Sequence, residues 1–225
     1  MRTFLLAIVL IALNGIAFSQ QPGKFGPASV WQPPQSFTTA AHAACDNKSQ
    51  GRRYADCYIE QMTKVGAPAD AVSFTRELYK QLHDVGIMTS FSKVGPADIA
   101  WVIYPIYDDK SYGLLLVNGQ PSIVNAEDLK LLDQKAMQQS FQFQGVKSQF
   151  PKVQLFTGDR DGQTWPNSQA GPNGGVQFTI GYALRNGCYT CAKAGFALFN
   201  WNFDATGKFT GTTFQGLTPA PLPGS

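Results

Sequence analysis

Cysteine is the residue type in this sequence with the clearest chemical potential. The 225-residue chain contains Cys45, Cys57, Cys188 and Cys191. An even number of cysteines in an exported protein is best explained by disulfides. Closeness along the chain favours Cys45 with Cys57 and Cys188 with Cys191, because each pair can close locally. The other pairings stay open, since connectivity cannot be deduced from sequence alone.

The Cys-Tyr-Thr-Cys motif at residues 188–191 suits several kinds of chemistry. A haem attachment site requires a histidine directly after the second cysteine, where this chain has Ala192. A structural zinc site could use all four thiolates, but an oxidising compartment disfavours free thiols. A redox-active pair needs its first cysteine at a helix N-terminus, where the dipole lowers the thiol pKa. The preceding Asn-Gly pair at 186–187 signals a hairpin turn instead, which favours a structural bridge.

Histidine chemistry has little support. The chain has only His42 and His83. Counted at about 100° per residue, His83 lies about 140° from the centre of the apolar stripe of its helix, so it should face solvent. His42 lies in a Pro- and Gly-rich segment. We therefore predict no catalytic histidine, no metal site and no cofactor.

Other motifs are fragments of known sites. Residues 159–162 (Asp-Arg-Asp-Gly) resemble part of a calcium loop, but the closing acid would fall at Ala170, which cannot ligate. Gly207-Lys208 lacks the rest of a phosphate loop. Asn47 begins a glycosylation sequon. The acids at turns and helix starts are expected to serve as caps and turn formers, and the sequence cannot bring two of them together in a glycosidic site; they are Asp98, Asp108, Asp109, Glu127 and Asp204.

The first residues have the pattern of a cleavable signal peptide. One positive charge at Arg2 precedes an apolar run at 4–13, and small residues follow at Ala17 and Ser19. The run is too short for a spanning helix, which needs about 20 apolar residues. We expect cleavage after Ser19 and a secreted or periplasmic protein without a membrane span.

Composition limits the class of partner. Charged residues make up 15% of the chain, against a usual fraction of about 25%. The formal net charge is only +3, and the basic residues are scattered. This gives little attraction for nucleic acid or an anionic membrane, so we exclude both as primary partners.

The elements divide the chain into a helical half and a β-rich half. Residues 20–44 are predicted to be a Pro- and Gly-rich leader that Phe25, Trp31 and Phe37 could dock on the domain. Apolar residues three and four apart predict helices over 51–65 and 68–85. Residues 99–107 and 112–117 are predicted strands, 123–124 a short one, and Asn125 the start of a helix with Asp128 three residues on.

The last third is predicted to be an antiparallel meander. Strands are expected at 153–156, 176–185, 194–203 and 208–214, with a loop at 158–175 and a Pro-rich tail at 218–225. The pattern predicts an α+β fold, with N-terminal helices on one face of a mainly antiparallel sheet and a single globular domain over 45–217.

Function is the least determined property. The aromatic strand around Trp201 could form a carbohydrate- or base-stacking platform, but its alternation favours a core face. The leading hypothesis is a non-catalytic binding or interaction domain whose protein or small-molecule partner is unknown. The alternative is a thiol–disulfide oxidoreductase that uses Cys188 and Cys191.

Overall fold

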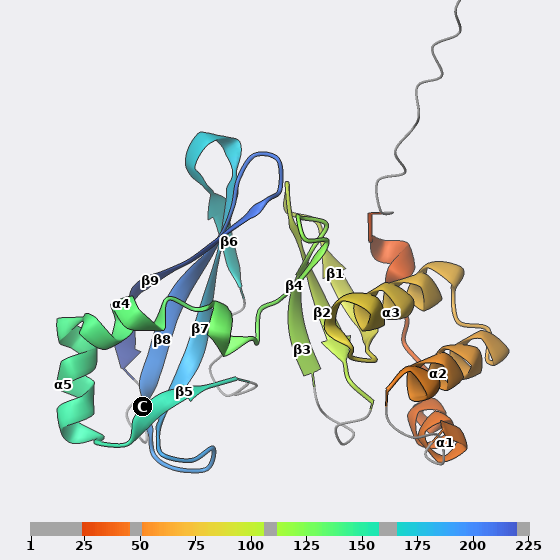
Figure 1. Ribbon diagram of the computed structural model, residues 1–225, viewed down its shortest axis with the longest axis horizontal. Helices are drawn as coiled ribbons and strands as arrows, with labels where there is room; N and C mark the ends of the chain where they lie inside the picture. The colour runs from red at the N-terminus through yellow and green to blue at the C-terminus, as the bar shows by residue number, and fades with distance from the viewer. Residues whose placement is uncertain (1–23, 46–50, 106–111, 158–165, 220–225) are drawn as a thin grey trace, which may run out of the picture.

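The protein has an α+β fold in which helices come first and strands dominate the C-terminal part (Figure 1). The computed structural model describes residues 24–45, 51–105, 112–157 and 166–219. The α-helices are α1 (Gln35–Cys45), α2 (Arg52–Lys64), α3 (Ala69–Leu82), α4 (Gln134–Gln139) and α5 (Phe141–Gln149).

Helices α2 and α3 confirm the helices predicted over 51–65 and 68–85. On α2 the buried face includes Tyr54, Tyr58 and Met62, spaced by four residues. On α3 it includes Phe74 and Leu78, also four apart. Residues at this spacing lie above one another on a helix, so each helix buries one apolar stripe.

Helix α1 lies inside the segment that we expected to be an extended leader. It buries Phe37, Ala41 and Cys45, again spaced by four. Pro34 directly precedes the helix, and proline suits a helix start as well as a linker, so a high proline content alone did not separate the two. The chain before α1 is also docked, since Trp31 N donates to Met88 O at 2.9 Å.

The first sheet is a four-stranded antiparallel meander in the order β1-β2-β3-β4. Its strands are β1 (Ile87–Ser92), β2 (Asp98–Ile103), β3 (Tyr112–Val117) and β4 (Ile123–Asn125). One face packs Ala100 and Val102 against Phe74 of α3. The opposite face contributes Ile99 and Leu114 to the core shared with the second sheet. This confirms that the strand beginning near residue 99 is covered on both faces.

The second sheet is the predicted C-terminal meander, in the order β5-β7-β8-β9 with β6 also paired to β7. Its strands are β5 (Val153–Phe156), β6 (Asn167–Ala170), β7 (Val176–Asn186), β8 (Lys193–Phe203) and β9 (Phe209–Pro219). Strand β6 lies in the stretch expected to be a loop. All four of its residues are exposed, so it has no apolar alternation that a sequence pattern could detect.

The segment after β4 differs from the helix predicted to start at Asn125. The side chain of Asn125 accepts from Glu127 N at 2.9 Å, which forms a turn. Asp128 accepts from Lys130 N and caps only a 3₁₀ turn (Leu129–Leu131). The helices α4 and α5 begin later, where Asp133 and Ser140 provide the N-cap oxygens.

The two sheets share one core. The inner face of the second sheet buries alternate residues of β7 and β8, including Phe178, Tyr182, Phe199 and Trp201. Leu116 of the first sheet belongs to the same cluster. Backbone bonds join the sheets at one end, where Gln120 N donates to Gly207 O at 2.8 Å and Phe209 N donates to Gln120 O at 2.9 Å.

Candidate functional site

The bridge between Cys188 and Cys191 closes the turn between β7 and β8, as the sequence predicts. The two Cα atoms are 5.0 Å apart, and Cys191 N donates to Cys188 O at 3.1 Å, which makes a tight turn. Cys188 is exposed and Cys191 is half-buried. The motif is not at a helix N-terminus, so the dipole that activates many redox cysteines has no counterpart here.

An arginine and two aromatic rings hold this turn. Arg185 Nη1 donates to Cys191 O at 3.0 Å, and its guanidinium lies over the ring of Tyr189, 5.4 Å from the centroid. The Tyr189 ring meets the edge of Phe156 with centroids 6.2 Å apart. Tyr189 nevertheless keeps 51% of its surface exposed. These contacts give the bridge a structural setting that holds the β7–β8 register.

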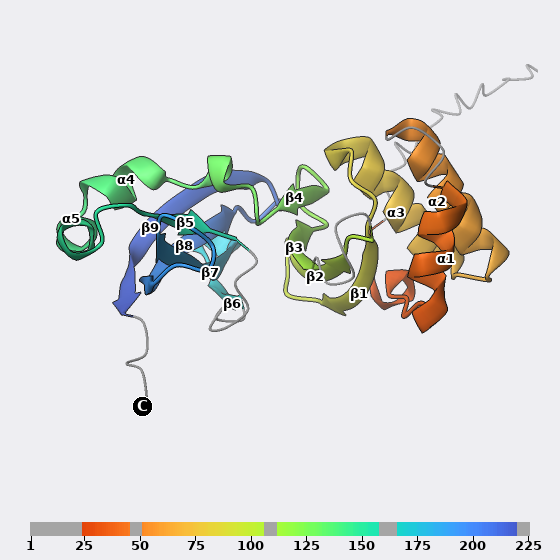
Figure 2. The ribbon, with the colours of Figure 1, turned by 90° about the horizontal axis from the view of Figure 1, so that it is seen from below.

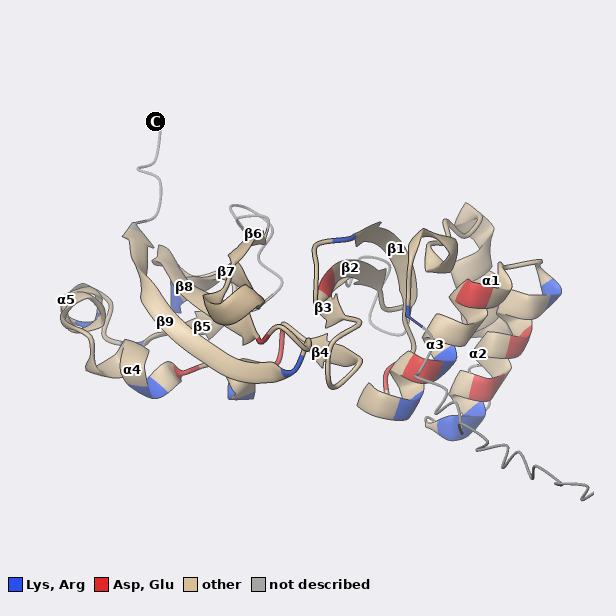
Figure 3. Ribbon diagram, turned by 90° about the horizontal axis from the view of Figure 1, so that it is seen from above, with Lys and Arg blue, Asp and Glu red and all other residues tan. Residues whose placement is uncertain are grey.

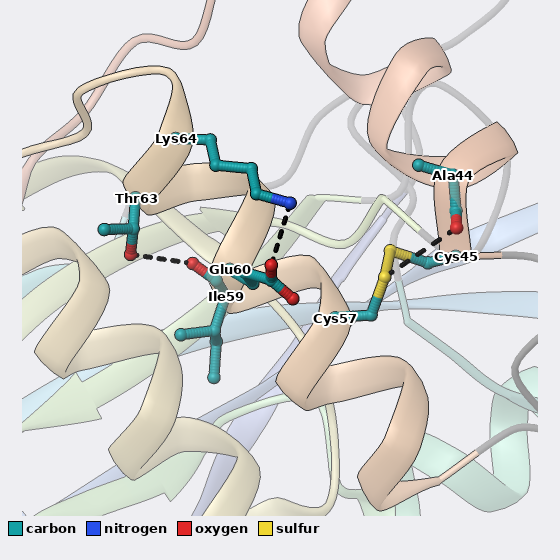
Figure 4. Close-up of polar contacts among 7 residues, drawn as sticks. All are labelled: Ala44, Cys45, Cys57, Ile59, Glu60, Thr63 and Lys64. Carbon is teal, nitrogen blue, oxygen red and sulfur yellow. Dashed lines mark hydrogen bonds and ion pairs between the residues drawn. A yellow bond between two sulfur atoms is a disulfide. The ribbon is translucent and has the colours of Figure 1, made fainter.

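The bridge between Cys45 and Cys57 joins the last residue of α1 to α2 and is buried (Figure 4). Cys57 Sγ lies 3.8 Å from Ala44 O, and this is a contact, because an oxidised sulfur has no proton to donate. On the same helix, Lys64 pairs with Glu60 at 2.8 Å on the exposed side. The bridge therefore fixes α1 against the helical core and is not open to a substrate.

Both histidines lie at the surface on different helices. His42 of α1 is exposed, and its Nδ1 is 3.3 Å from Tyr54 Oη. His83 is exposed, as predicted, and forms the left-handed C-cap of α3 with φ 60°. A histidine needs partner groups for general acid–base or metal chemistry, and the contacts of these two are with tyrosine rings.

Two of the acids singled out in the sequence, Asp98 and Asp204, have structural roles. Asp98 is buried, and its carboxylate accepts from Val94 N at 2.7 Å and Asn118 Nδ2 at 2.7 Å. Asp204 closes the β8–β9 turn, where hydrogen bonds from Thr206 and Lys208 lower the pKa of its carboxyl. Within the described ranges no three metal-ligating side chains come together. Residues 1–19, Asn47, Asp108, Asp109 and the calcium-like fragment 159–162 lie outside those ranges.

The aromatic strand around Trp201 is a core face and not a stacking platform. Trp201 has no exposed surface, and its Nε1 donates to Tyr182 Oη at 2.9 Å. Its ring stacks on Phe209 with centroids 5.5 Å apart. A ligand could reach this face only by separating the two sheets. The alternation in β8 thus places Phe199, Trp201 and Phe203 inside.

The opposite, outer face of the second sheet is lined with uncharged polar side chains. We call it the neutral face and define it by six residues. Strand register places them side by side across four strands, because Gln169 faces Gln177, Gln177 faces Asn202, Thr179 faces Asn200, and Asn200 faces Thr213. Figure 2 shows α4 and α5 on one side of this sheet; their buried Met137 and Phe143 pack into the inner core, so the neutral face is on the other side. The six are Gln169, Gln177, Thr179, Asn200, Asn202 and Thr213.

Side chains of the neutral face bond head to tail across the sheet. Gln169 Nε2 donates to Gln177 Oε1 at 3.0 Å, and Gln177 Nε2 donates to Asn202 Oδ1 at 2.8 Å. Asn202 Nδ2 then approaches Thr213 Oγ1 at 3.4 Å. In a parallel row, Thr179 Oγ1 donates to Asn200 Oδ1 at 2.7 Å. The amides are therefore held in one orientation before any ligand arrives.

The six side chains of the neutral face carry no charge, and the nearest described charges along the chain are Asp204, two residues after Asn202, and Lys208, directly before β9. Strands β5, β6 and β9 contain no Lys, Arg, Asp or Glu, and β7 and β8 contain only Arg185 and Lys193. Both of these cations lie at the hairpin end, six positions from Thr179 and seven from Asn200 along their strands. Figure 3 shows charged residues concentrated on α2 and α3 and the strands of the second sheet largely tan.

Apolar side chains continue the same face toward the hairpin. Phe156, Ala183 and Phe196 face one another across β5, β7 and β8, and Leu198 lies between them and Asn200. Phe156 and Leu198 are half-buried, whereas Phe196 is 7% exposed. Lys193 lies 5.0 Å from the centroid of the Phe196 ring. The outer face thus changes from hydrogen-bonding rows to an apolar row along the strands.

The chain matches no protein-family model, no curated protein and no solved structure.

The sequence contained part of the signal for the neutral face. Gln177 and Thr179 alternate with Phe178 and Ile180, and the alternation predicted a half-buried strand. The polar half of such a strand is normally only a solvated surface. What distinguishes this one is the pairing of amide with amide on the next strand, which depends on register and not on composition.

In the described residues no helix has the length and apolar character needed to cross a bilayer.

Proposed function

We propose that the chain is a secreted or periplasmic, non-catalytic binding domain, stabilised by two disulfides, and that it binds its ligand with the neutral face. The observation that carries this proposal is the head-to-tail row from Gln169 through Gln177 and Asn202 to Thr213. Hydrogen-bonding groups that are already oriented lose less entropy when a ligand binds.

Export is supported by the disulfides together with the N-terminal pattern. Disulfides persist in oxidising compartments and are rare in the cytosol. Both bridges are local, at sequence separations of 12 and 3. A signal peptide ending at Ser19 would deliver the chain to such a compartment.

A binding role fits the chemistry of the amide row. A side-chain amide has two N–H donors and a carbonyl oxygen with two lone pairs. Gln177 uses one donor and one acceptor position in the row and keeps the others for a ligand. None of these groups is a nucleophile or a general base at neutral pH, which favours recognition over catalysis.

The test compares the chain with Gln177→Met, which keeps side-chain length and removes the amide. The full exported chain is offered a panel of neutral and charged oligosaccharides, peptides, and neutral and anionic lipid vesicles, with binding followed by calorimetry. The matched control is Gln138→Ala, an exposed glutamine on α4. We expect at least one class to bind, to be recovered chemically unchanged, and to lose affinity only in Gln177→Met. Conversion of a panel compound, binding by no class, or binding insensitive to Gln177→Met would contradict the proposal.

The thiol–disulfide alternative has one observation in its favour. Cys188 is exposed, and the guanidinium of Arg185 lies on the same turn. A nearby cation stabilises a thiolate. The reduction potential separates the two functions, because structural bridges lie below about −300 mV and catalytic pairs are higher. A potential above that value, with disulfide-exchange activity lost in Cys188→Ser, would favour the oxidoreductase.

A further inference from the structure

We propose that the ligand of the neutral face is an uncharged carbohydrate chain. This inference rests on the proposed function, because it names the chemical class recognised by the same face. It follows from three properties of the outer surface of the second sheet: its lack of charge, its mixture of donors and acceptors, and the apolar row beside it.

The lack of charged side chains on the neutral face disfavours charged ligands. Among the described residues, Arg185 and Lys193 are at the hairpin and Lys208 is at the β8–β9 turn, while the six residues of the neutral face themselves carry no charge at any accessible pH. A nucleic acid or an anionic headgroup gains most of its affinity from clustered cations, and the six residues of the neutral face include none. A charged ligand would lose hydration on this face without gaining an ion pair. The complementary ligand is therefore neutral.

Hydrogen bonding narrows the class further. The amides of Gln169 and Gln177 offer donors and acceptors, whereas Asn202 Nδ2 is already bonded to Gly211 O at 3.2 Å; Thr213 adds a hydroxyl that can donate and accept. A sugar hydroxyl likewise donates and accepts, so it can donate a hydrogen bond to an amide oxygen or accept one from an amide nitrogen. Neighbouring strands lie about 4.8 Å apart, which repeats these groups at regular intervals across the sheet. A chain of hydroxyl-bearing rings presents a matching series.

The apolar row supplies the second half of sugar recognition. Sugar rings have C–H faces that are less polar than their hydroxyl-bearing edges. Phe156 and Leu198 retain exposed surface on the outer face, and Tyr189 at the hairpin is half-exposed. An aromatic ring offers a large apolar surface for such a face. Leu198 is two positions from Asn200, and Phe156 faces Ala183, four positions from Thr179, so a chain of several rings is needed to contact both the apolar row and the amide row.

A protein partner is the main rival, and the face fits it less well. Protein interfaces are enriched in Tyr, Trp, Phe, Met and Arg at their centre. The centre of this face is instead Gln177, Thr179 and Asn202. Among the described residues of this face, the exposed aromatic residue is Tyr189 at the hairpin end.

The experiment measures binding of defined oligosaccharides by titration calorimetry. The probes are neutral hexasaccharides of glucose, mannose, galactose and N-acetylglucosamine, with hexagalacturonate as the charged comparison and an uncharged peptide library as the protein comparison. The proteins are the full exported chain, Gln177→Met, Gln169→Met and the control Gln138→Ala. Thermal unfolding of each variant verifies that it folds, and the exposed position of Gln169 keeps one test variant free of packing effects.

We expect at least one neutral hexasaccharide to bind, with about tenfold weaker affinity in Gln177→Met, a smaller loss in Gln169→Met, and no change in Gln138→Ala. Binding of no neutral sugar, or tighter binding of hexagalacturonate, would overturn the carbohydrate inference. If only peptides bind and Gln177→Met abolishes that binding, the carbohydrate inference fails while the proposed binding function stands. If sugar binding is unaffected by both test variants, the carbohydrate inference and the proposed binding by the neutral face both fail.

Discussion

Trp201 Nε1 donates a hydrogen bond to Tyr182 Oη at 2.9 Å, and that hydroxyl donates in turn to Ala126 O at 2.6 Å. All three residues are buried. The hydroxyl thus joins two strands of the second sheet to the chain that leaves β4 of the first. It satisfies a donor and an acceptor that would otherwise be buried without partners.

Removing that hydroxyl should destabilise the protein, and removing a similar one elsewhere should not. Tyr182→Phe leaves the Trp201 indole and the Ala126 carbonyl unpaired, which we expect to cost about 2 kcal/mol. Tyr58 is equally buried, but among the described residues its Oη has no hydrogen-bond partner. Tyr58→Phe should therefore be neutral or stabilise the fold by up to about 1 kcal/mol. Urea unfolding of both variants measures the difference, and equal losses would contradict it.

The same two tyrosines predict a loss of stability in alkali. Burial raises the pKa of both Tyr58 and Tyr182 above the ordinary value of 10.0. The unfolded chain then releases these protons at lower pH than the folded chain does. Stability is fully present below about pH 10 and falls above it, by roughly 1.4 kcal/mol per pH unit for each tyrosine. Denaturant titrations from pH 8 to 11 should show a shallower decline in the double Phe variant, and parallel curves would refute this account.

Sequence patterns predicted most elements because those elements bury one face. The spacing of Tyr58 and Met62 located α2, and the alternation at 176–185 located β7. Two kinds of element were missed: α1, whose buried spacing of four stands in a Pro- and Gly-rich segment, and elements without a buried pattern. Strand β6 is exposed throughout, and α5 begins with Phe141, which is 93% exposed and so contradicts a simple amphipathic pattern.

The candidate site was harder to predict than the fold. Bridging of Cys188 to Cys191 could be inferred from proximity, since three residues of separation close a turn. The neutral face could not be inferred from the sequence, because it requires Gln177 to lie opposite Asn202 and Thr179 opposite Asn200. Those pairings come from a register that includes a bulge near Arg185, and a pattern within one strand does not specify it.

The two disulfides should contribute unequally to stability. The hairpin bridge closes a very short loop, so replacing Cys188 and Cys191 with serine should cost about 2 kcal/mol or slightly less on the loop-closure model. The Cys45–Cys57 bridge closes a longer loop and is buried, and replacing both cysteines with alanine should cost about 3 kcal/mol or more. Denaturant unfolding gives both values. A larger loss from the hairpin pair would show that loop closure is not the dominant effect.

Thr179 should matter more to stability than Thr213, although both belong to the neutral face. Thr179→Val keeps the shape and leaves Asn200 Oδ1, on a residue only 4% exposed, without its 2.7 Å donor. We expect a loss of about 1 kcal/mol. Thr213 is exposed, and water replaces its hydroxyl, so Thr213→Val should stay within about 0.5 kcal/mol. Thermal unfolding compares the two variants. Equal losses of stability would show that the hydrogen bond from Thr179 to Asn200 does not stabilise the sheet.

The central claim is that the neutral face binds the ligand, and side-chain amide NMR tests it most directly. A ¹⁵N-labelled chain is titrated with the neutral hexasaccharide that calorimetry selects, while the NH₂ signals of Gln169, Gln177 and Asn202 are followed beside that of Gln138. The account predicts saturable shifts in the three neutral-face amides and none in Gln138. Shifts confined to the Cys188–Cys191 hairpin, or equal shifts at Gln138, would contradict it.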